Sequence, residues 1–211
     1  VEDALPGQLV RARVAAVRKS LAEAALVEVL ERSPDEQEPP CPHAGRCGGC
    51  SWQSLAYGRQ LAWKERIVHD ALERVGKVAC PPMLPILPSP SEWGYRNKME
   101  FAFGVSGDGG KALGLRERGS RNIVEVTGCL LQTPLTMRVL EAVRMLSNGA
   151  FHDLDGRFLV VREPNAGGCF VELIVGAGGS LEAGERFAEA LRAETPEVTG
   201  FALSERLAPS D

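Results

Sequence analysis

Three cysteines at short spacing are the residues of this chain best suited to chemistry. Cys41, Cys47 and Cys50 follow the pattern C-x5-C-x2-C, and two glycines let the backbone turn tightly between the last two. Three thiolates in one short segment can bind one metal centre, either a [4Fe–4S] cluster or a structural zinc ion. A fourth ligand must then come from elsewhere in the chain, and Cys129 is a candidate. Such a centre would connect two distant parts of the sequence.

The six cysteines also allow a disulfide framework, because their number is even. We favour metal binding for two reasons. The sequence shows no N-terminal signal peptide, and 211 residues can form a core without disulfides. Cys169 lies in an apolar strand pattern and Cys80 in a proline-rich connector, so we interpret both as buried or free thiols.

Composition predicts a soluble, cytoplasmic protein without a membrane span. Hydrophobic residues make up 44% of the chain, and no apolar run approaches the ~18 residues that cross a bilayer. The formal net charge of −4 does not indicate a nucleic-acid binder, but the charge is uneven. Between residues 96 and 121, basic side chains outnumber acidic ones, which could form a local phosphate-binding face. A solvated surface of mixed charge is the alternative interpretation.

The hydrophobic pattern predicts an α+β fold with mainly antiparallel strands. A β-hairpin is expected first, then a helix, then two groups of strands that are each followed by a helix. Thr133-Pro134 is typical of a helix start and Gly149 of a helix end. The expected strands are residues 8–17, 23–31, 98–105, 112–116, 122–126, 157–163, 169–175 and 198–203, and the expected helices are 54–75, 134–148 and 180–194.

The glycine-rich turn at residues 176–179 looks like a dinucleotide-binding turn, because it lies between a predicted strand and a predicted helix. However, the third glycine of the G-x-G-x-x-G pattern would fall at Leu181. We also expect no βαβ unit around this turn. The sequence therefore favours a tight strand-to-helix loop over a nucleotide site.

Several motifs together resemble one family. The segment from Cys41 to Gly76 resembles the iron–sulfur segment of RNA uracil-5 methyltransferases. Tyr95-Arg-Asn-Lys-Met-Glu-Phe101 is similar to a signature of that family's central domain, as is the stretch 114–126 leading to Cys129-Leu-Leu-Gln132. Residues 4–13 resemble the second half of the TRAM domain, a small OB-like RNA-binding barrel.

This resemblance implies a domain order and a ligand set. Residues 1–32 would be the C-terminal half of a TRAM domain, 33–80 the iron–sulfur segment with its helix, and 81–211 a central α+β domain. Family members hold a [4Fe–4S] cluster with three clustered cysteines and one distant cysteine. The matching positions are Cys41, Cys47, Cys50 and Cys129.

The resemblance also implies a function for the parent protein. It would be an S-adenosylmethionine-dependent RNA (uracil-5-)-methyltransferase that modifies rRNA or tRNA, and this chain would be its RNA-binding part, expected to be monomeric. The family's catalytic and S-adenosylmethionine motifs are not found in the sequence, so we assign no catalytic residue and expect the chain alone to be inactive. A stand-alone, non-catalytic RNA-binding module with zinc or an iron–sulfur cluster is the alternative. The candidate RNA-binding residues are Arg96, Lys98, Arg116, Arg118 and Arg121.

Overall fold

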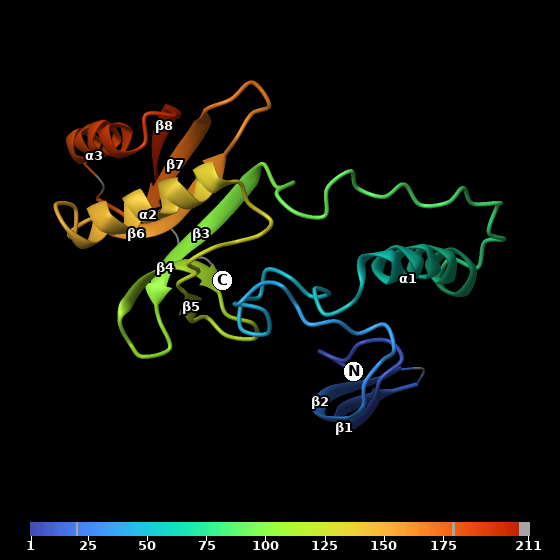
Figure 1. Ribbon diagram of the computed structural model, residues 1–211. Helices are drawn as coiled ribbons and strands as arrows, with labels where there is room; N and C mark the ends of the chain where they lie inside the picture. Colours follow the sequence, from blue (N-terminus) through green and yellow to red (C-terminus); the bar gives the residue numbers. More distant parts are fainter. Residues whose placement is uncertain (20, 179, 207–211) are drawn as a thin grey trace. The chain divides into compact units, whose positions relative to one another are not determined.

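The computed structural model describes residues 1–19, 21–178 and 180–206. Its internal contacts divide the chain into two compact units. Figure 1 shows the chain coloured by residue number from the N-terminus to the C-terminus. The first unit comprises residues 1–44 and 50–92. The second comprises residues 45–49 and the chain from Trp93 onward. Ser20, in the predicted hairpin link, and Gly179, in the glycine-rich turn, lie outside the described residues.

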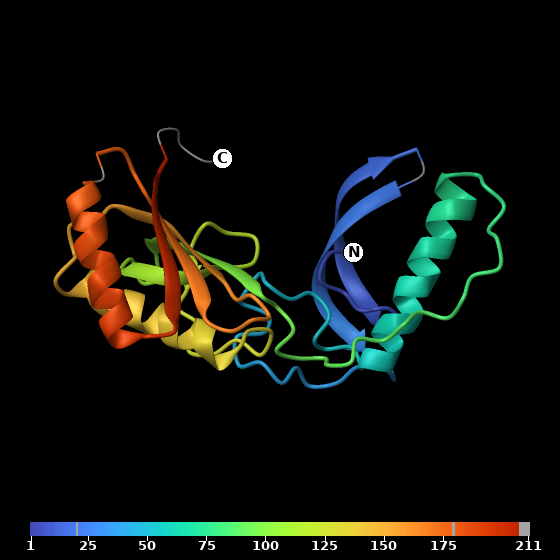
Figure 2. The same ribbon diagram turned by 90° about the horizontal axis from the view of Figure 1, so that it is seen from above.

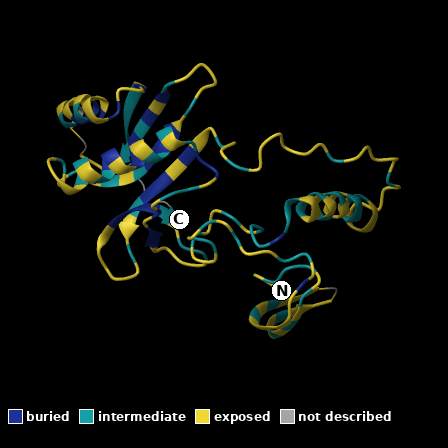
Figure 3. Cartoon of the chain, viewed as in Figure 1, coloured by how far each residue is buried: buried dark blue, intermediate teal, exposed yellow. Residues whose placement is uncertain are grey.

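The first unit begins with the predicted antiparallel hairpin. Strand β1 (Leu9–Arg18) pairs with β2 (Leu21–Glu31), and the register shifts at several points along the ladder. In the described residues this sheet contains only these two strands. Figure 3 shows that most of the hairpin is exposed or half-buried, in contrast to the sheet of the second unit. Val14 and Val17, for example, are exposed.

The helix of the first unit is shorter than expected at its start. Helix α1 (Tyr57–Asp70) continues into a single π-helical turn, η1 (Ala71–Val75), and neither contains a buried residue. The apolar side chains of this helix are covered only in part, since Leu61 and Leu72 are half-buried whereas Val68 and Val75 are exposed. The proline-rich connector runs back beside α1 (Figure 2), and Tyr57 Oη accepts a hydrogen bond of 2.8 Å from the backbone N–H of Ser89. No helix among the described residues has both the length and the apolar character needed to cross a membrane.

The second unit is a six-stranded sheet covered by two helices, which confirms the predicted α+β class. The strand order is β5-β4-β3-β6-β7-β8, and all pairs except the last are antiparallel. Buried residues of both helices share one core cluster with Phe101, Leu159 and Leu173, which lie in register on neighbouring strands. Both helices therefore cover the same face of the sheet. The elements are β3 (Lys98–Val105), β4 (Lys111–Arg116), β5 (Ile123–Val124), α2 (Pro134–Asn148), β6 (Gly156–Arg162), β7 (Cys169–Val175), α3 (Leu181–Glu194) and β8 (Val198–Glu205).

The limits of α2 are as the sequence predicted. The Oγ1 atom of Thr133 accepts a hydrogen bond of 3.2 Å from the Thr136 N–H, and Pro134 occupies the first helical position. Gly149 follows the last helical residue. A threonine cap satisfies one of the free N–H groups at a helix start, which typically stabilises the helix by about 1 kcal/mol. The cap also fixes the direction in which the chain enters α2 from Cys129.

One sequence expectation is wrong. Strands β7 and β8 run parallel and are joined through α3, so they form a βαβ unit at the glycine-rich turn. Alternating apolar residues predict a strand but not its direction, which is why the parallel pairing was missed. The loop nevertheless has an internal partner, because the Gly178 N–H donates to the carboxylate of Glu205. A carboxylate of the chain itself therefore occupies this donor.

Candidate metal centre and adjoining basic residues

The segment Gly45–Gly49, here called the Cys47 segment, is held against the end of β4. Cys47 forms an isolated antiparallel bridge with Glu117, and the Gly48 N–H donates to the Arg116 carbonyl at 3.0 Å. The Arg118 N–H donates to the Arg46 carbonyl at 2.8 Å. A Cβ atom at Gly48 would lie 3.2 Å from the Arg116 oxygen, so glycine permits this close approach. These contacts fix the position of Cys47 in the second unit.

The Cys47 thiol lies in surroundings that suit a metal-binding thiolate. It is half-buried and packs against the core of the second unit. The Gly49 N–H donates to its Sγ atom at 3.4 Å. Backbone N–H donors of this kind also bind the sulfur of metal thiolates and orient it.

Cys129 is also half-buried against the core of the second unit. It follows β5 and opens a turn that is closed by a 3.1 Å hydrogen bond from the Gln132 N–H to the Cys129 carbonyl. The turn is held from outside, because Gly94 and Arg96 donate backbone hydrogen bonds to the carbonyls of the two residues between Cys129 and Gln132. The second unit thus positions both Cys47 and Cys129.

Gln132 was not singled out as a functional residue by the sequence. Its side chain is buried, with 6% exposed, and neither its Nε2 nor its Oε1 has a hydrogen-bond partner in the part of the chain that is described. Buried amides without partners are rare and costly in folded proteins. Burial of this glutamine depends on distant contacts, so no local sequence signal could have indicated it.

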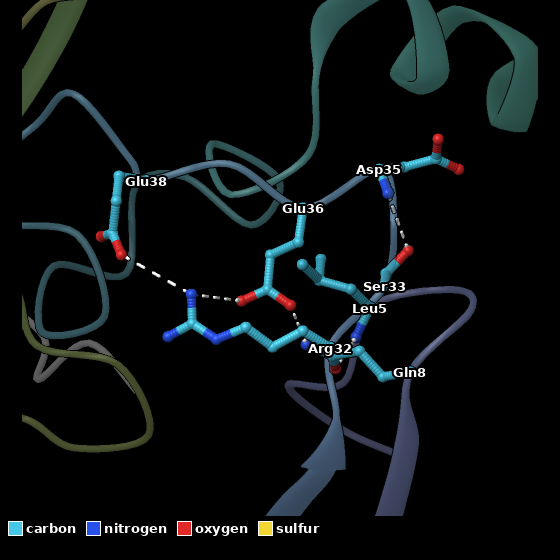
Figure 4. Close-up of polar contacts among 7 residues, drawn as sticks. All are labelled: Leu5, Gln8, Arg32, Ser33, Asp35, Glu36 and Glu38. Atoms are coloured by element: carbon cyan, nitrogen blue, oxygen red, sulfur yellow. Dashed lines mark hydrogen bonds and ion pairs between the residues drawn. The ribbon is translucent and has the colours of Figure 1, made fainter.

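Cys41 and Cys50 belong to the first unit. The linker of residues 32–38, which leads to Cys41, is anchored to the hairpin by the polar contacts shown in Figure 4. Gln8 donates to the Glu36 carboxylate at 2.8 Å, and Arg32 lies 3.7 Å from both Glu36 and Glu38. The Ser33 Oγ accepts from the backbone N–H of Asp35 at 3.3 Å. Residues 32–38 are therefore hydrogen-bonded or ion-paired to residues at the start of β1 and the end of β2.

None of the six cysteines forms a disulfide in the structure. Cys169 is fully buried, and burial, with a smaller contribution from Glu163, raises the pKa of its thiol to about 11. Cys80 is half-buried. Over the described residues, no three His, Cys, Asp or Glu side chains are gathered as a metal site. What fits a soft metal centre is the donor chemistry, namely four half-buried cysteines outside disulfides and an unpartnered buried amide in the same turn as Cys129.

The structure brings three of the five predicted basic residues to the Cys47 segment. Arg116 and Arg118 bind it through their backbones, and the Nη2 of Arg96 donates to the Gly49 carbonyl at 3.5 Å. Arg46, which the sequence reasoning missed, lies within the segment and has an exposed side chain. We call Arg46, Arg96, Arg116 and Arg118 the basic rim. Two predicted residues stand apart from it in these contacts, the exposed Arg121 and Lys98, which is paired across β3 and β6 with Arg162.

Glu117 is the acidic residue within this surface. It accepts hydrogen bonds from the Ser120 hydroxyl at 2.8 Å and the Asn122 amide at 3.0 Å. These two donors hold the pKa of its carboxyl below the ordinary value, so it stays ionised at neutral pH. The Arg46 Nε lies 3.9 Å from it, an exposed pair that contributes little to stability. Glu117 therefore offsets part of the positive charge of the rim.

Arg144 on α2 connects the helix to both strands beside the candidate centre. Its guanidinium is buried and donates to the Leu113 carbonyl at 2.7 and 2.9 Å and to the Val126 carbonyl at 3.0 Å. Val126 precedes Cys129 by three residues. Arg144 thereby positions the segment that leads to Cys129. This positioning role of Arg144 was not predictable from the sequence, because an arginine on a helix is usually a surface residue.

Comparisons with known proteins place this arrangement in context. No protein-family model matches the chain. A protein of Nitratidesulfovibrio vulgaris named "Uncharacterized RNA methyltransferase" is 47% identical over 216 residues, an alignment that covers 98% of the chain and 46% of the relative. The chain is similar to RNA methyltransferases. A Nostoc sp. protein named "Uncharacterized RNA methyltransferase alr3654" is 32% identical over 212 residues, an alignment that covers 97% of the chain and 46% of the relative. The chain thus spans about half the length of these two curated relatives.

Proposed function

We propose that this chain is the RNA-binding and [4Fe–4S]-bearing portion of an S-adenosylmethionine-dependent RNA (uracil-5-)-methyltransferase that acts on rRNA or tRNA. The observation that carries the proposal is the similarity to RNA methyltransferases along nearly the whole chain. The chain spans about half of those relatives, so the binding of S-adenosylmethionine and the methyl transfer are assigned to the remainder of the parent protein. Residues 1–32 are proposed to be part of a TRAM barrel, 33–80 the iron–sulfur segment and 81–211 the central domain.

The proposed ligands of the cluster are Cys41, Cys47, Cys50 and Cys129. The absence of these cysteines from disulfides and the N–H donor at Cys47 support this assignment. When bound, the cluster would supply strong iron–thiolate bonds that cross-link the Cys47 segment to the turn at Cys129. Two residues of the chain already hold these parts by themselves, because Gly48 is bonded to β4 and Gln132 closes the turn. A four-thiolate zinc site is the competing occupant.

The basic rim, together with Lys98 and Arg121, is proposed to bind the phosphate backbone of the RNA. Arginine guanidinium groups bind phosphate with two parallel hydrogen bonds, and such contacts position RNA without reading its bases. The Arg116 and Arg118 backbones hold the Cys47 segment, so loss of the metal would loosen the same residues that face the RNA. The target uridine would then have to leave its stack to reach a catalytic domain.

The proposal can be tested by the salt dependence of RNA binding. Replacing Arg116, Arg118 and Arg121 together with alanine removes two side chains of the basic rim and that of the exposed Arg121. We expect weaker binding to a labelled single-stranded oligouridine and to unrelated RNAs alike. The slope of log affinity against log salt should fall by about 2, because each lost phosphate contact to single strands contributes about 0.7. Fluorescence anisotropy over a salt series measures both quantities.

A matched variant separates a local RNA surface from a general charge effect. Arg138, Arg157 and Arg186 are exposed arginines of the same unit on α2, β6 and α3, and none contacts the Cys47 segment in the hydrogen bonds and ion pairs found. Replacing these three with alanine changes the net charge equally and should leave the salt slope close to that of the parent chain. Equal losses in both triple variants would contradict the proposed surface.

A further inference from the structure

The buried amide of Gln132 points to a contact that the protein chain itself does not provide. The side chain is 6% exposed, yet its nitrogen donor and its oxygen acceptor both lack partners in the described part of the chain. Thr195 Oγ1 is another such atom in the second unit, at the end of α3. Gln132 differs from Thr195 in its position, because it shares a turn with a candidate metal ligand.

The backbone of Gln132 is held by its own N–H and by both neighbouring residues, so the orphaned amide is not the result of a loosely placed residue. Its N–H closes the turn to the Cys129 carbonyl at 3.1 Å. The next residue, Thr133, caps α2 and also donates its hydroxyl to the Glu163 carboxylate. The preceding residue, Leu131, accepts a 3.0 Å hydrogen bond from the Arg96 N–H. The position of Gln132 is therefore fixed from both sides.

Gln132 and Cys129 are the fourth and first residues of one turn, closed by the hydrogen bond between their backbones. The first and fourth residues of a β-turn have Cα atoms less than about 7 Å apart, within reach of a glutamine side chain. Sulfur in a metal thiolate is a hydrogen-bond acceptor only, and an amide nitrogen is a donor. The unused donor and the candidate ligand thus match in chemistry and belong to the same turn.

We infer that Gln132 is a positioning residue for the metal centre, whose Nε2 donates to the sulfur of Cys129 or of a cluster bound there. This role rests on the proposed metal centre. Such donors orient ligands and take up charge on sulfur, and they are among the factors that set the reduction potentials of iron–sulfur clusters. Gln132 would stabilise the reduced cluster, in which sulfur carries more negative charge.

The experiment compares the chain without and with its metal centre, using anaerobic reconstitution of the full 211-residue polypeptide with iron and sulfide. Replacing Gln132 with methionine keeps the side-chain length and removes the amide. Without metal, this variant should melt at the same temperature as the parent chain or higher, because a costly buried amide is gone. With metal, it should release iron to a chelator about tenfold faster, and its midpoint potential should fall. Gln132→Glu, which retains size but not the donor, should also lose iron faster.

Thr195→Val is the control, since it removes a buried hydroxyl that likewise lacks a partner, at a site without cysteine neighbours in its turn. It should match Gln132→Met in the melting experiment but retain the parent's iron release and potential. If Gln132→Met releases iron at the parent's rate and with an unchanged potential, the inferred role of Gln132 is overturned while the cluster stands. If the parent chain itself takes up neither iron nor zinc, the metal centre and the role of Gln132 fall together.

Discussion

Replacing Arg144 with methionine tests whether a buried guanidinium holds the candidate centre in place. Arg144 makes three hydrogen bonds to two backbone carbonyls, those of Leu113 on β4 and Val126 before Cys129. Only 13% of its side chain is exposed. Methionine retains the apolar stem that packs on the sheet but none of the donors. The substitution thus isolates the hydrogen bonds from the packing.

The expected cost follows from the two carbonyl groups that lose their charged donor. Each buried acceptor without a partner costs about 1–3 kcal/mol, so with two such carbonyls the free energy of unfolding should fall by about 2–6 kcal/mol. At about 3 °C per kcal/mol for a chain of this length, the melting temperature should decrease by roughly 6–18 °C. The ion pair to the exposed Glu141, at 3.5 Å, adds little to this figure.

Hydrogen exchange at the amides of β4 and α2 is a suitable assay, since it reports on the second unit alone. Arg138→Met is the matched control on the same helix, because Arg138 is 54% exposed and pairs only with the Glu197 carboxylate. It should cost about 1 kcal/mol or less. If the two variants were equally stable, Arg144 would be an ordinary surface arginine. Its assigned role in positioning the Cys129 segment would then be refuted.

Three further predictions concern the iron content of the chain, its binding of S-adenosylmethionine and the pH dependence of its stability. Purified without oxygen, the chain should carry about four iron and four sulfide ions, measured by chemical analysis. Serine should abolish this content at Cys41, Cys47, Cys50 or Cys129, and preserve it at Cys80 or Cys169; zinc without sulfide would favour the competing occupant. Calorimetric titration of this chain with S-adenosylmethionine should give no saturable heat, and saturable binding would show that the donor site is misplaced. The raised pKa of Cys169 makes the folded state bind a proton that the unfolded state releases, so stability should decline between about pH 9 and pH 11. Cys169→Ala should flatten that decline in denaturation curves recorded across this range, and an unchanged curve would contradict the assignment.

Features that depend on neighbouring residues were predictable from the sequence. The limits of α2 follow from Thr133, Pro134 and Gly149, which act on the backbone next to them. The first hairpin and the strand 98–105 follow from alternating side chains, which indicate a strand wherever one face is buried. The metal centre indicated by the cysteine spacing stays a prediction.

Features that depend on distant contacts were not predictable. The direction of β8 is set by its pairing with β7 through α3, and no local pattern encodes it. Burial of Gln132 and Arg144 results from the packing of α2 on the sheet. The apolar residues of α1 are covered only in part by the described chain, because amphipathicity indicates a helix without specifying what covers it.

The Cys47 segment has a consequence for how the chain can be divided. It supplies five residues to the second unit, although the chain on both sides of it belongs to the first. A single proteolytic cut in the connector between Val78 and Glu92 would therefore leave two fragments that still complement each other, since the N-terminal one retains the partners of Arg116 and Arg118. A polypeptide that begins at Trp93 would lack them. The natural boundary of the second unit is thus discontinuous in sequence, and fragments of this protein are expected to assemble in pairs.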